Sequence, residues 1–123
     1  QVASIWPSNS AANTVCSNFA SGSTNAYVIH VAEGINQTAR NQFATLYTMT
    51  TPDGCLFDPR TAIVHGNALF PAHFEDMGDA KMKLVWSPRS NVGLYGLGTD
   101  LTVTTDIPEA LANGISVSLA PEW

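Results

Sequence analysis

The segment Ala26-Tyr27-Val28-Ile29-His30-Val31-Ala32, which is followed by Glu33-Gly34, decides the expected fold. Its β-branched and aromatic residues favour a β-strand, and the glycine after it ends that strand. Further apolar segments follow along the chain, separated by many of its 9 glycines and 7 prolines. Apolar segments spaced at roughly 8–12 residues with turn signals between them are typical of an all-β sandwich or barrel.

The remaining segments are interpreted in the same way. Residues 42–51 also have a spacing that suits a helix, but their threonines favour a strand because β-branched side chains lose freedom in helices. Gly66-Asn67 predicts a tight hairpin turn, and Pro71 then belongs at an edge or a bulge. Residues 75–79 are expected to form an acidic loop, and residues 107–114 a short helix that begins near a proline and ends at Asn113-Gly114. We expect the further strands at residues 42–51, 55–57, 61–65, 68–75, 81–86, 92–97, 101–107 and 115–119.

These segments predict one domain, residues 1–123, of the all-β class. An antiparallel β-barrel or sandwich of about eight strands with one short helix leaves few open strand edges, which is why we expect it. No apolar run approaches the roughly 18–20 residues that a membrane-spanning helix requires. We therefore expect no membrane insertion.

The composition is low in charge. Charged residues make up 12% of the chain and hydrophobic residues 45%, and the net charge is −5. A disordered chain is poor in apolar residues, and a nucleic-acid-binding protein carries a basic excess. The composition excludes both classes, and it predicts contacts through uncharged polar and aromatic side chains rather than through electrostatic steering.

The two cysteines, Cys16 and Cys55, are expected to form a disulfide, because the sequence has no CxxC motif and two cysteines alone do not make a cysteine-rich zinc site. The sequence Asn36-Gln37-Thr38 is an acceptor for N-glycosylation at Asn36. Together with the low lysine content and the start at Gln1 without a methionine, these features predict a secreted, extracellular protein.

Three histidines are weak candidates for a metal site. His30, His65 and His73 each lie on an expected strand, so they bind zinc or copper only if the strands bring them together. The sequence favours the alternative, in which they are hydrogen-bonded on a sheet face. His73-Phe74-Glu75 matches only the first part of the zinc deaminase signature, because no P-C-x-x-C follows. We expect no cofactor and no catalytic residue.

Aromatic residues near the two ends of the chain are candidates for contact with a partner. Trp6 and Trp123 are expected either to pack together and seal the barrel or to stand exposed as contact residues. The sequence favours the sealing role.

The combination of one disulfide, one glycosylation acceptor, few lysines and abundant threonine, serine and asparagine resembles the small secreted proteins of filamentous fungi. Among them it resembles the elicitor or effector proteins of plant-pathogenic species. The resemblance implies a non-enzymatic protein that induces hypersensitive plant defence through a host plant protein or cell-surface receptor. Two other functions remain open: a binding module for a small apolar ligand or a glycan, and a small secreted metal-assisted hydrolase that uses His30, His65 and His73.

Overall fold

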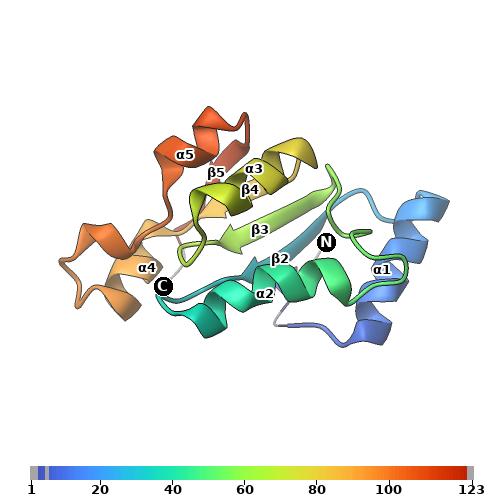
Figure 1. Ribbon diagram of the computed structural model, residues 1–123, viewed down its shortest axis with the longest axis horizontal. Coiled ribbons are helices and arrows are strands. Elements are labelled where there is room, and N and C mark those ends of the chain that lie inside the picture. Colours follow the sequence, from blue (N-terminus) through green and yellow to red (C-terminus); the bar gives the residue numbers. More distant parts are fainter. Residues whose placement is uncertain (1–2, 5, 122–123) are drawn as a thin grey trace.

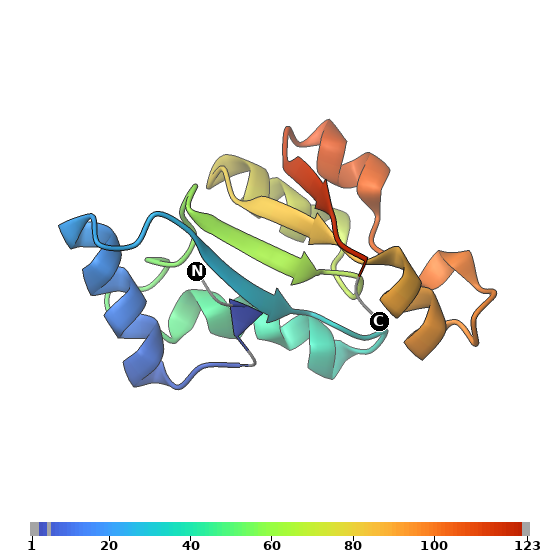
Figure 2. The same ribbon diagram turned by 180° about the vertical axis from the view of Figure 1, so that it is seen from behind.

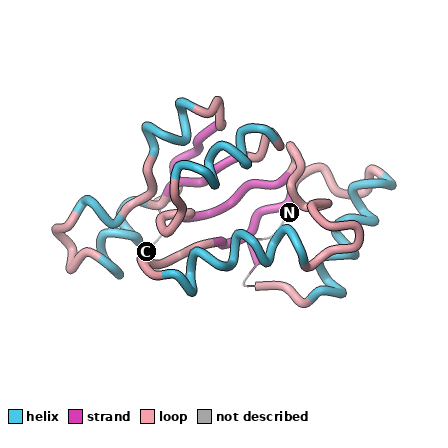
Figure 3. The backbone as a smooth tube through the Cα atoms, viewed as in Figure 1, coloured by secondary structure: helices cyan, strands magenta, loops and turns pink. Residues whose placement is uncertain are grey.

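The protein alternates helices and parallel strands. The computed structural model describes residues 3–4 and 6–121. Figure 3 shows helix and strand segments following one another along the tube, joined by loops. The helices are α1 (Asn9–Ser21), α2 (Gln37–Thr48), α3 (Pro71–Asp79), α4 (Pro88–Tyr95), the 3-10 helix η1 (Leu101–Val103) and α5 (Ile107–Ala112).

Within the part of the chain that the structure describes, the strands form one five-stranded sheet. Their spatial order equals the chain order, β1-β2-β3-β4-β5, and every neighbouring pair is parallel. Each connection between neighbours is therefore a crossover, and right-handed crossovers in one direction place their helices on one face of a sheet. Figures 1 and 2 show α2, α3 and α5 on one side of the sheet and the strands uncovered on the other side. The strands are β1 (Ala3–Ser4), β2 (Tyr27–Val31), β3 (Thr61–His65), β4 (Lys83–Trp86) and β5 (Ser116–Leu119).

The hydrophobic core lies between the sheet and these helices. One row of side chains across the sheet, Ile29, Ile63 and Leu84, is fully buried, and the register places them side by side. Alternate positions such as Val28 and Ala62 point to the open face and are only partly buried, as the two-residue period of a strand requires. The helices contribute buried side chains to the same core, among them Phe43 and Leu46 from α2, Phe74 and Met77 from α3, and Ala110 from α5.

The expected antiparallel β-barrel or sandwich is wrong. The expected strands at 61–65, 81–86 and 115–119 correspond to β3, β4 and β5, but they pair in parallel. The strand expected at 42–51 lies mostly in α2, which begins after the N-cap residue Asn36 and buries Ala39, Phe43 and Leu46 at helical spacing. The hairpin expected at Gly66-Asn67 is instead the start of a crossover.

The other expected strands are also replaced by helices or turns. Pro71 is not at a sheet edge, because it occupies the first turn of α3, where its missing N–H costs nothing. The acidic residues 75–79 belong to α3 rather than to a loop, residues 92–95 lie in α4, and residues 101–103 form η1. Residues 55 and 56 lie in a turn, and Phe57 has no regular secondary structure. The helix expected at 107–114 is present as α5.

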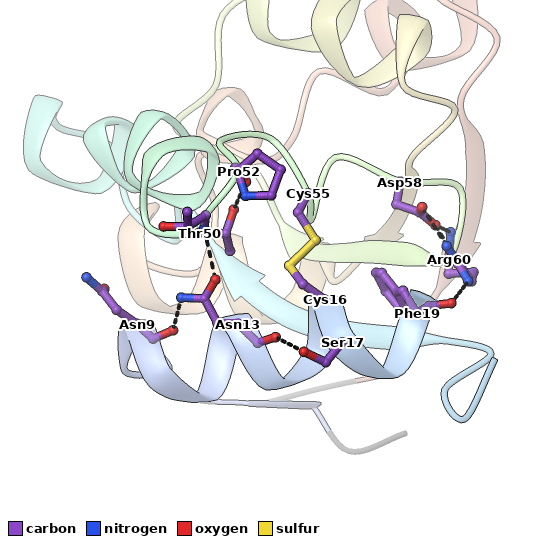
Figure 4. Close-up of a disulfide and its surroundings, with 11 residues drawn as sticks. Asn9, Asn13, Cys16, Ser17, Phe19, Thr50, Pro52, Cys55, Asp58 and Arg60 are labelled. Carbon is purple, nitrogen blue, oxygen red and sulfur yellow. Dashed lines mark hydrogen bonds and ion pairs between the residues drawn. A yellow bond between two sulfur atoms is a disulfide. The ribbon is translucent and has the colours of Figure 1, made fainter. Parts of the chain in front are cut away.

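The disulfide expected between Cys16 and Cys55 is present. It joins α1 to the loop between α2 and β3, and Figure 4 shows Arg60 beside it, next to Asp58 and Phe19. Arg60 donates hydrogen bonds to both carboxylate oxygens of Asp58 and to the backbone oxygen of Phe19. The same loop is therefore held to α1 by one covalent bond and one charge-assisted cluster.

Among residues 3–4 and 6–121, no helix is long and apolar enough to cross a membrane.

Candidate metal centre

Two of the candidate histidines meet at the carboxyl ends of β2 and β3. His30 lies in β2 and His65 is the last residue of β3, and the parallel register pairs Val31 with His65. Glu33 follows two residues after β2 ends. Because parallel strands end at the same edge of a sheet, these three side chains come from one edge.

The backbone at this edge departs from regular strand geometry. Ala32 and His65 both have positive φ angles, 56° and 73°, in the left-handed region that non-glycine residues rarely occupy. Hydrogen bonds hold these turns: Ala32 N donates to Gln42 Oε1, and Gly66 N donates to Val31 O. Strained backbone of this kind persists only where the surroundings impose it, and it is concentrated at functional sites.

The three side chains present their ligand atoms to one another. The His30 and His65 ring centroids lie 5.0 Å apart, and His65 Nε2 lies 3.5 Å from Glu33 Oε2. One nitrogen from each histidine and one oxygen of Glu33 all lie within 4.8 Å of one another. The His65 side chain is 1% exposed, whereas that of Glu33 is 30% exposed. The cluster therefore has a buried end and a solvent-facing end.

This set of donors fits zinc. Zinc binds histidine nitrogen and carboxylate oxygen at roughly 2.0–2.2 Å, and catalytic zinc sites use three protein ligands with a fourth position open. At those lengths two tetrahedral ligands lie about 3.3–3.5 Å apart. The separation of 3.5 Å between His65 and Glu33 already matches that value. His30, Glu33 and His65 could hold a metal ion if the ligand atoms, which all lie within 4.8 Å of one another, moved closer together.

Two residues of α4 complete the surroundings. Asn91 is fully buried, and its Nδ2 lies 3.1 Å from His65 Nδ1. Tyr95 lies beside Glu33: burial raises the pKa of the Tyr95 hydroxyl, and the charge of the Glu33 carboxylate and a hydrogen bond to it raise that pKa further. Figure 2 shows α4 beyond the carboxyl ends of the strands, which is where it meets the cluster.

His73 does not join this cluster. It lies in the first turn of α3, where its Nδ1 accepts a hydrogen bond from the backbone N–H of Phe70 and its ring contacts Phe43. Burial lowers the pKa of His73, and the positive charge of Arg40 lowers it further. His73 is therefore a structural residue between α2 and α3.

Glu33, Asn91 and Tyr95 lie at the site although they were not predicted as site residues from the sequence. The spacing His30-Val31-Ala32-Glu33 at the end of a strand is a signal that pointed to Glu33. No comparable pattern marks Asn91 or Tyr95, whose segment was expected to form a turn and a strand and instead forms α4. Of the tryptophans proposed as contact residues, Trp6 is partly buried and packs against the hydrophobic core, and Trp123 lies outside the described residues. The glycosylation candidate Asn36 is exposed and caps α2.

No protein-family model and no curated protein matches the sequence. Solved structures do match. A mutant of atrazine chlorohydrolase TrzN from Arthrobacter aurescens TC1, complexed with zinc and atraton, superposes with a TM-score of 0.73 at 13% identity over 94% of this chain. Triazine hydrolase from the same species matches with a TM-score of 0.69 at 17% identity over 94% of the chain. A 5-methylcytosine deaminase from Klebsiella pneumoniae, liganded with 5-fluorocytosine, matches with a TM-score of 0.65 at 15% identity over 93%.

The fold is that of part of a parallel α/β barrel. The chain spans 24% of the length of the two Arthrobacter structures and 29% of the deaminase. In such barrels, active sites lie at the carboxyl ends of the strands, which is the edge that carries His30, Glu33 and His65.

The expectation of a non-enzymatic elicitor of plant defence is therefore wrong. It rested on a composition typical of secreted proteins and on the lack of catalytic motifs, whereas the solved structures that share this fold are hydrolases and a deaminase. The convergence of His30, His65 and Glu33 favours the metal-assisted hydrolase among the alternatives.

Proposed function

We propose that this chain supplies part of the active site of a zinc-dependent hydrolase of the amidohydrolase type. The observation that carries the proposal is the convergence of His30, Glu33 and His65 within 4.8 Å at the carboxyl edge of a parallel α/β sheet. The fold similarity to a chlorohydrolase complexed with zinc supports it.

The residues of the cluster have distinct tasks in this proposal. His30 and His65 would hold the ion through ring nitrogens, and Glu33 would hold it through its carboxylate. The Glu33 carboxylate would also be able to accept a proton or a hydrogen bond. Tyr95 lies near that carboxylate: burial raises the pKa of the Tyr95 hydroxyl, and the negative charge of the carboxylate contributes to raising it further. A bound zinc ion supplies Lewis-acid activation of water and of the bond to be broken.

The substrate class that the comparisons suggest is a nitrogen heterocycle with a displaceable substituent. The proteins that share the fold are named as acting on atrazine, triazines and 5-methylcytosine. We propose hydrolytic displacement of such a substituent as the reaction class.

Zinc binding by the purified chain tests the proposal. We expect the wild-type chain to bind one zinc ion in competition with a chromophoric chelator. The variants His30→Ala, His65→Ala and Glu33→Gln should each weaken that binding. His73→Ala is the matched control, because His73 contacts Phe43 and Phe70 outside the cluster, and it should bind zinc as the wild type does. Absence of zinc binding, or equal binding by all four variants, would overturn the proposal.

Secretion and glycosylation at Asn36 stay predictions. The disulfide supports secretion, because disulfides persist mainly in oxidising compartments.

A further inference from the structure

A chain of hydrogen bonds, part-buried at Trp86 and Thr104 and buried at Asn91, leads from β4 to His65. The Trp86 indole Nε1 donates to Thr104 Oγ1 at 2.8 Å, and the Thr104 hydroxyl donates to Asn91 Oδ1 at 3.1 Å. The other end of the Asn91 amide, Nδ2, lies 3.1 Å from His65 Nδ1. Asn91 and His65 are 0% and 1% exposed, so the contact between them is shielded from water.

The Asn91 amide orientation in this structure, with Oδ1 toward Thr104 and Nδ2 toward His65, corresponds to one tautomer of His65. An indole N–H only donates, so Thr104 accepts from Trp86 and its own hydrogen is left to point at Asn91. With Oδ1 turned toward Thr104, the Asn91 amide presents its N–H to His65, and His65 Nδ1 must accept. A neutral imidazole carries one proton, so in this arrangement the proton is on Nε2, which faces Glu33.

That arrangement is incompatible with a metal ion on the same nitrogen. A metal at Nε2 uses the lone pair of Nε2, so the ring proton moves to Nδ1 and Nδ1 becomes a donor. The partner of Nδ1 must then be an oxygen. Asn91 can provide one if its side-chain amide turns over, so that Oδ1 faces His65 and Nδ2 faces Thr104.

We propose that Asn91 is a positioning residue for His65 and that its side-chain amide has opposite orientations in the metal-free and the metal-loaded chain. This inference rests on the metal site of the proposed function. Thr104 makes both orientations possible because its oxygen has two lone pairs. In the metal-free chain it accepts from Trp86 and donates to Asn91, and in the loaded chain it accepts from both, with its hydrogen turned to the solvent side of this half-buried residue.

Substitutions at Asn91 separate positioning from mere packing. Asn91→Asp offers only acceptors, so it should place the His65 proton on Nδ1 even without metal. Asn91→Leu keeps a similar volume but offers neither donor nor acceptor. Loss of a hydrogen-bond partner behind a metal ligand typically costs about 10–100-fold in metal affinity, and we expect a loss of that size for Asn91→Leu. Thr104→Val, which no longer orients the amide, should give a mixture of His65 tautomers.

The test combines zinc affinity with the histidine tautomer. Long-range proton–nitrogen spectra of the ¹⁵N-histidine-labelled chain distinguish Nδ1–H from Nε2–H. We expect His65 of the wild-type chain to carry its proton on Nε2 without zinc and on Nδ1 with zinc, and His65 of Asn91→Asp to carry it on Nδ1 in both states. Circular dichroism reports whether each variant is folded, and the Asp and Val variants decide the matter if the Leu variant does not fold.

The outcomes distinguish this inference from the proposed function. If the wild-type chain binds no zinc, the proposed function fails and this inference fails with it. If the wild-type chain binds zinc but its metal-free His65 already carries the proton on Nδ1, only the inference is overturned. Equal zinc affinity and an unchanged tautomer in Asn91→Asp and Asn91→Leu would also overturn it alone.

Discussion

Gly78 in α3 packs directly against the backbone of Asn113, the residue that ends α5. A β-carbon at Gly78 would lie 2.5 Å from the Asn113 carbonyl oxygen, closer than real β-carbons approach a neighbour. The contact is between two backbones, so neither side has a flexible side chain that can move away. The absence of a side chain at Gly78 therefore sets how closely α3 and α5 approach each other on the sheet.

Gly78→Ala is expected to destabilise the protein for this reason. Overpacking of a close contact costs about 1–3 kcal/mol, which outweighs the gain of about 1 kcal/mol that alanine brings to a helix. Gly93→Ala is the matched control, since Gly93 is exposed in α4 and a β-carbon there meets nothing within 4 Å. It should raise the free energy of unfolding. Urea unfolding of both variants measures the difference, and a stabilised Gly78→Ala would contradict the close contact.

Removal of the disulfide should lower the free energy of unfolding. Cys16 and Cys55 are 39 residues apart. In the chain-entropy model, closing a loop of that length lowers the entropy of the unfolded chain and so raises its free energy by about 4 kcal/mol. The double variant Cys16→Ala, Cys55→Ala should therefore unfold at a lower urea concentration than the oxidised wild type. The reduced wild-type chain serves as the control and should behave like the double variant; unchanged stability in both would show that the bond contributes nothing.

Acid should destabilise the loop that precedes β3 through Asp58. The hydrogen bond from the Arg60 side chain lowers the pKa of the Asp58 carboxyl below its usual value, and the nearby positive charge acts in the same direction. The folded state then binds fewer protons than the unfolded state, so this stabilisation is fully present above a pH of about 4 and is lost as the pH falls through the lowered pKa.

Asp58→Asn checks that pH dependence. It should lower stability at neutral pH and flatten the loss of stability on acidification, both measured by urea unfolding at several pH values. Asp53→Asn, at an exposed position in the turns after α2, is the control. It should lose as much stability between neutral and acidic pH as the wild type does. A wild type and an Asp58→Asn variant with parallel pH profiles would rule out the Asp58 contribution.

Asn36 is expected to stabilise α2 through its side chain. Asn36 Oδ1 accepts a hydrogen bond from Ala39 N at 2.9 Å and so caps the first turn of α2. Asn36→Ala should lower the free energy of unfolding by about 1 kcal/mol, whereas Asn36→Asp keeps an acceptor and should stay close to the wild type.

The same pair of variants tests the glycosylation site. Both remove the acceptor sequence, so mass spectrometry of chains produced in a secreting eukaryotic host should show the glycan on the wild type only. A wild type without the mass of a glycan would refute glycosylation at Asn36.

The strand segments of the sheet were largely recognisable from sequence. Residues 27–31 and 61–65 are short, nearly continuous apolar runs, which is how strands covered on one or both faces appear. The helix at 107–112 was recognisable from its first-turn proline and its terminal Asn113-Gly114. These are local properties, so the residues alone were enough.

The other helices were not recognisable, because their local signals were mixed. In α2 the threonines favour a strand, yet Ala39, Phe43 and Leu46 bury one helical face against the sheet, and that tertiary contact outweighs the weak propensity. In α3 the meaning of Pro71 depends on whether the chain crosses over or turns back. Pro71 can be assigned to the first turn of a helix only once it is known that the chain crosses over after β3.

The amino-acid sequence by itself located the segments that form β2, β3, β4 and β5, and it showed that Cys16 and Cys55 were available as a pair and that His30 and His65 stood near strand ends. Tertiary structure decided that β2 and β3 run parallel, and this decides the site. Parallel pairing places both strand ends at one edge and joins His30, Glu33 and His65 there, whereas antiparallel pairing would have placed consecutive strand ends at opposite edges. The residues that support the cluster, Asn91 and Tyr95, come from α4, more than twenty residues later in the chain, and only packing at that edge brings them to it.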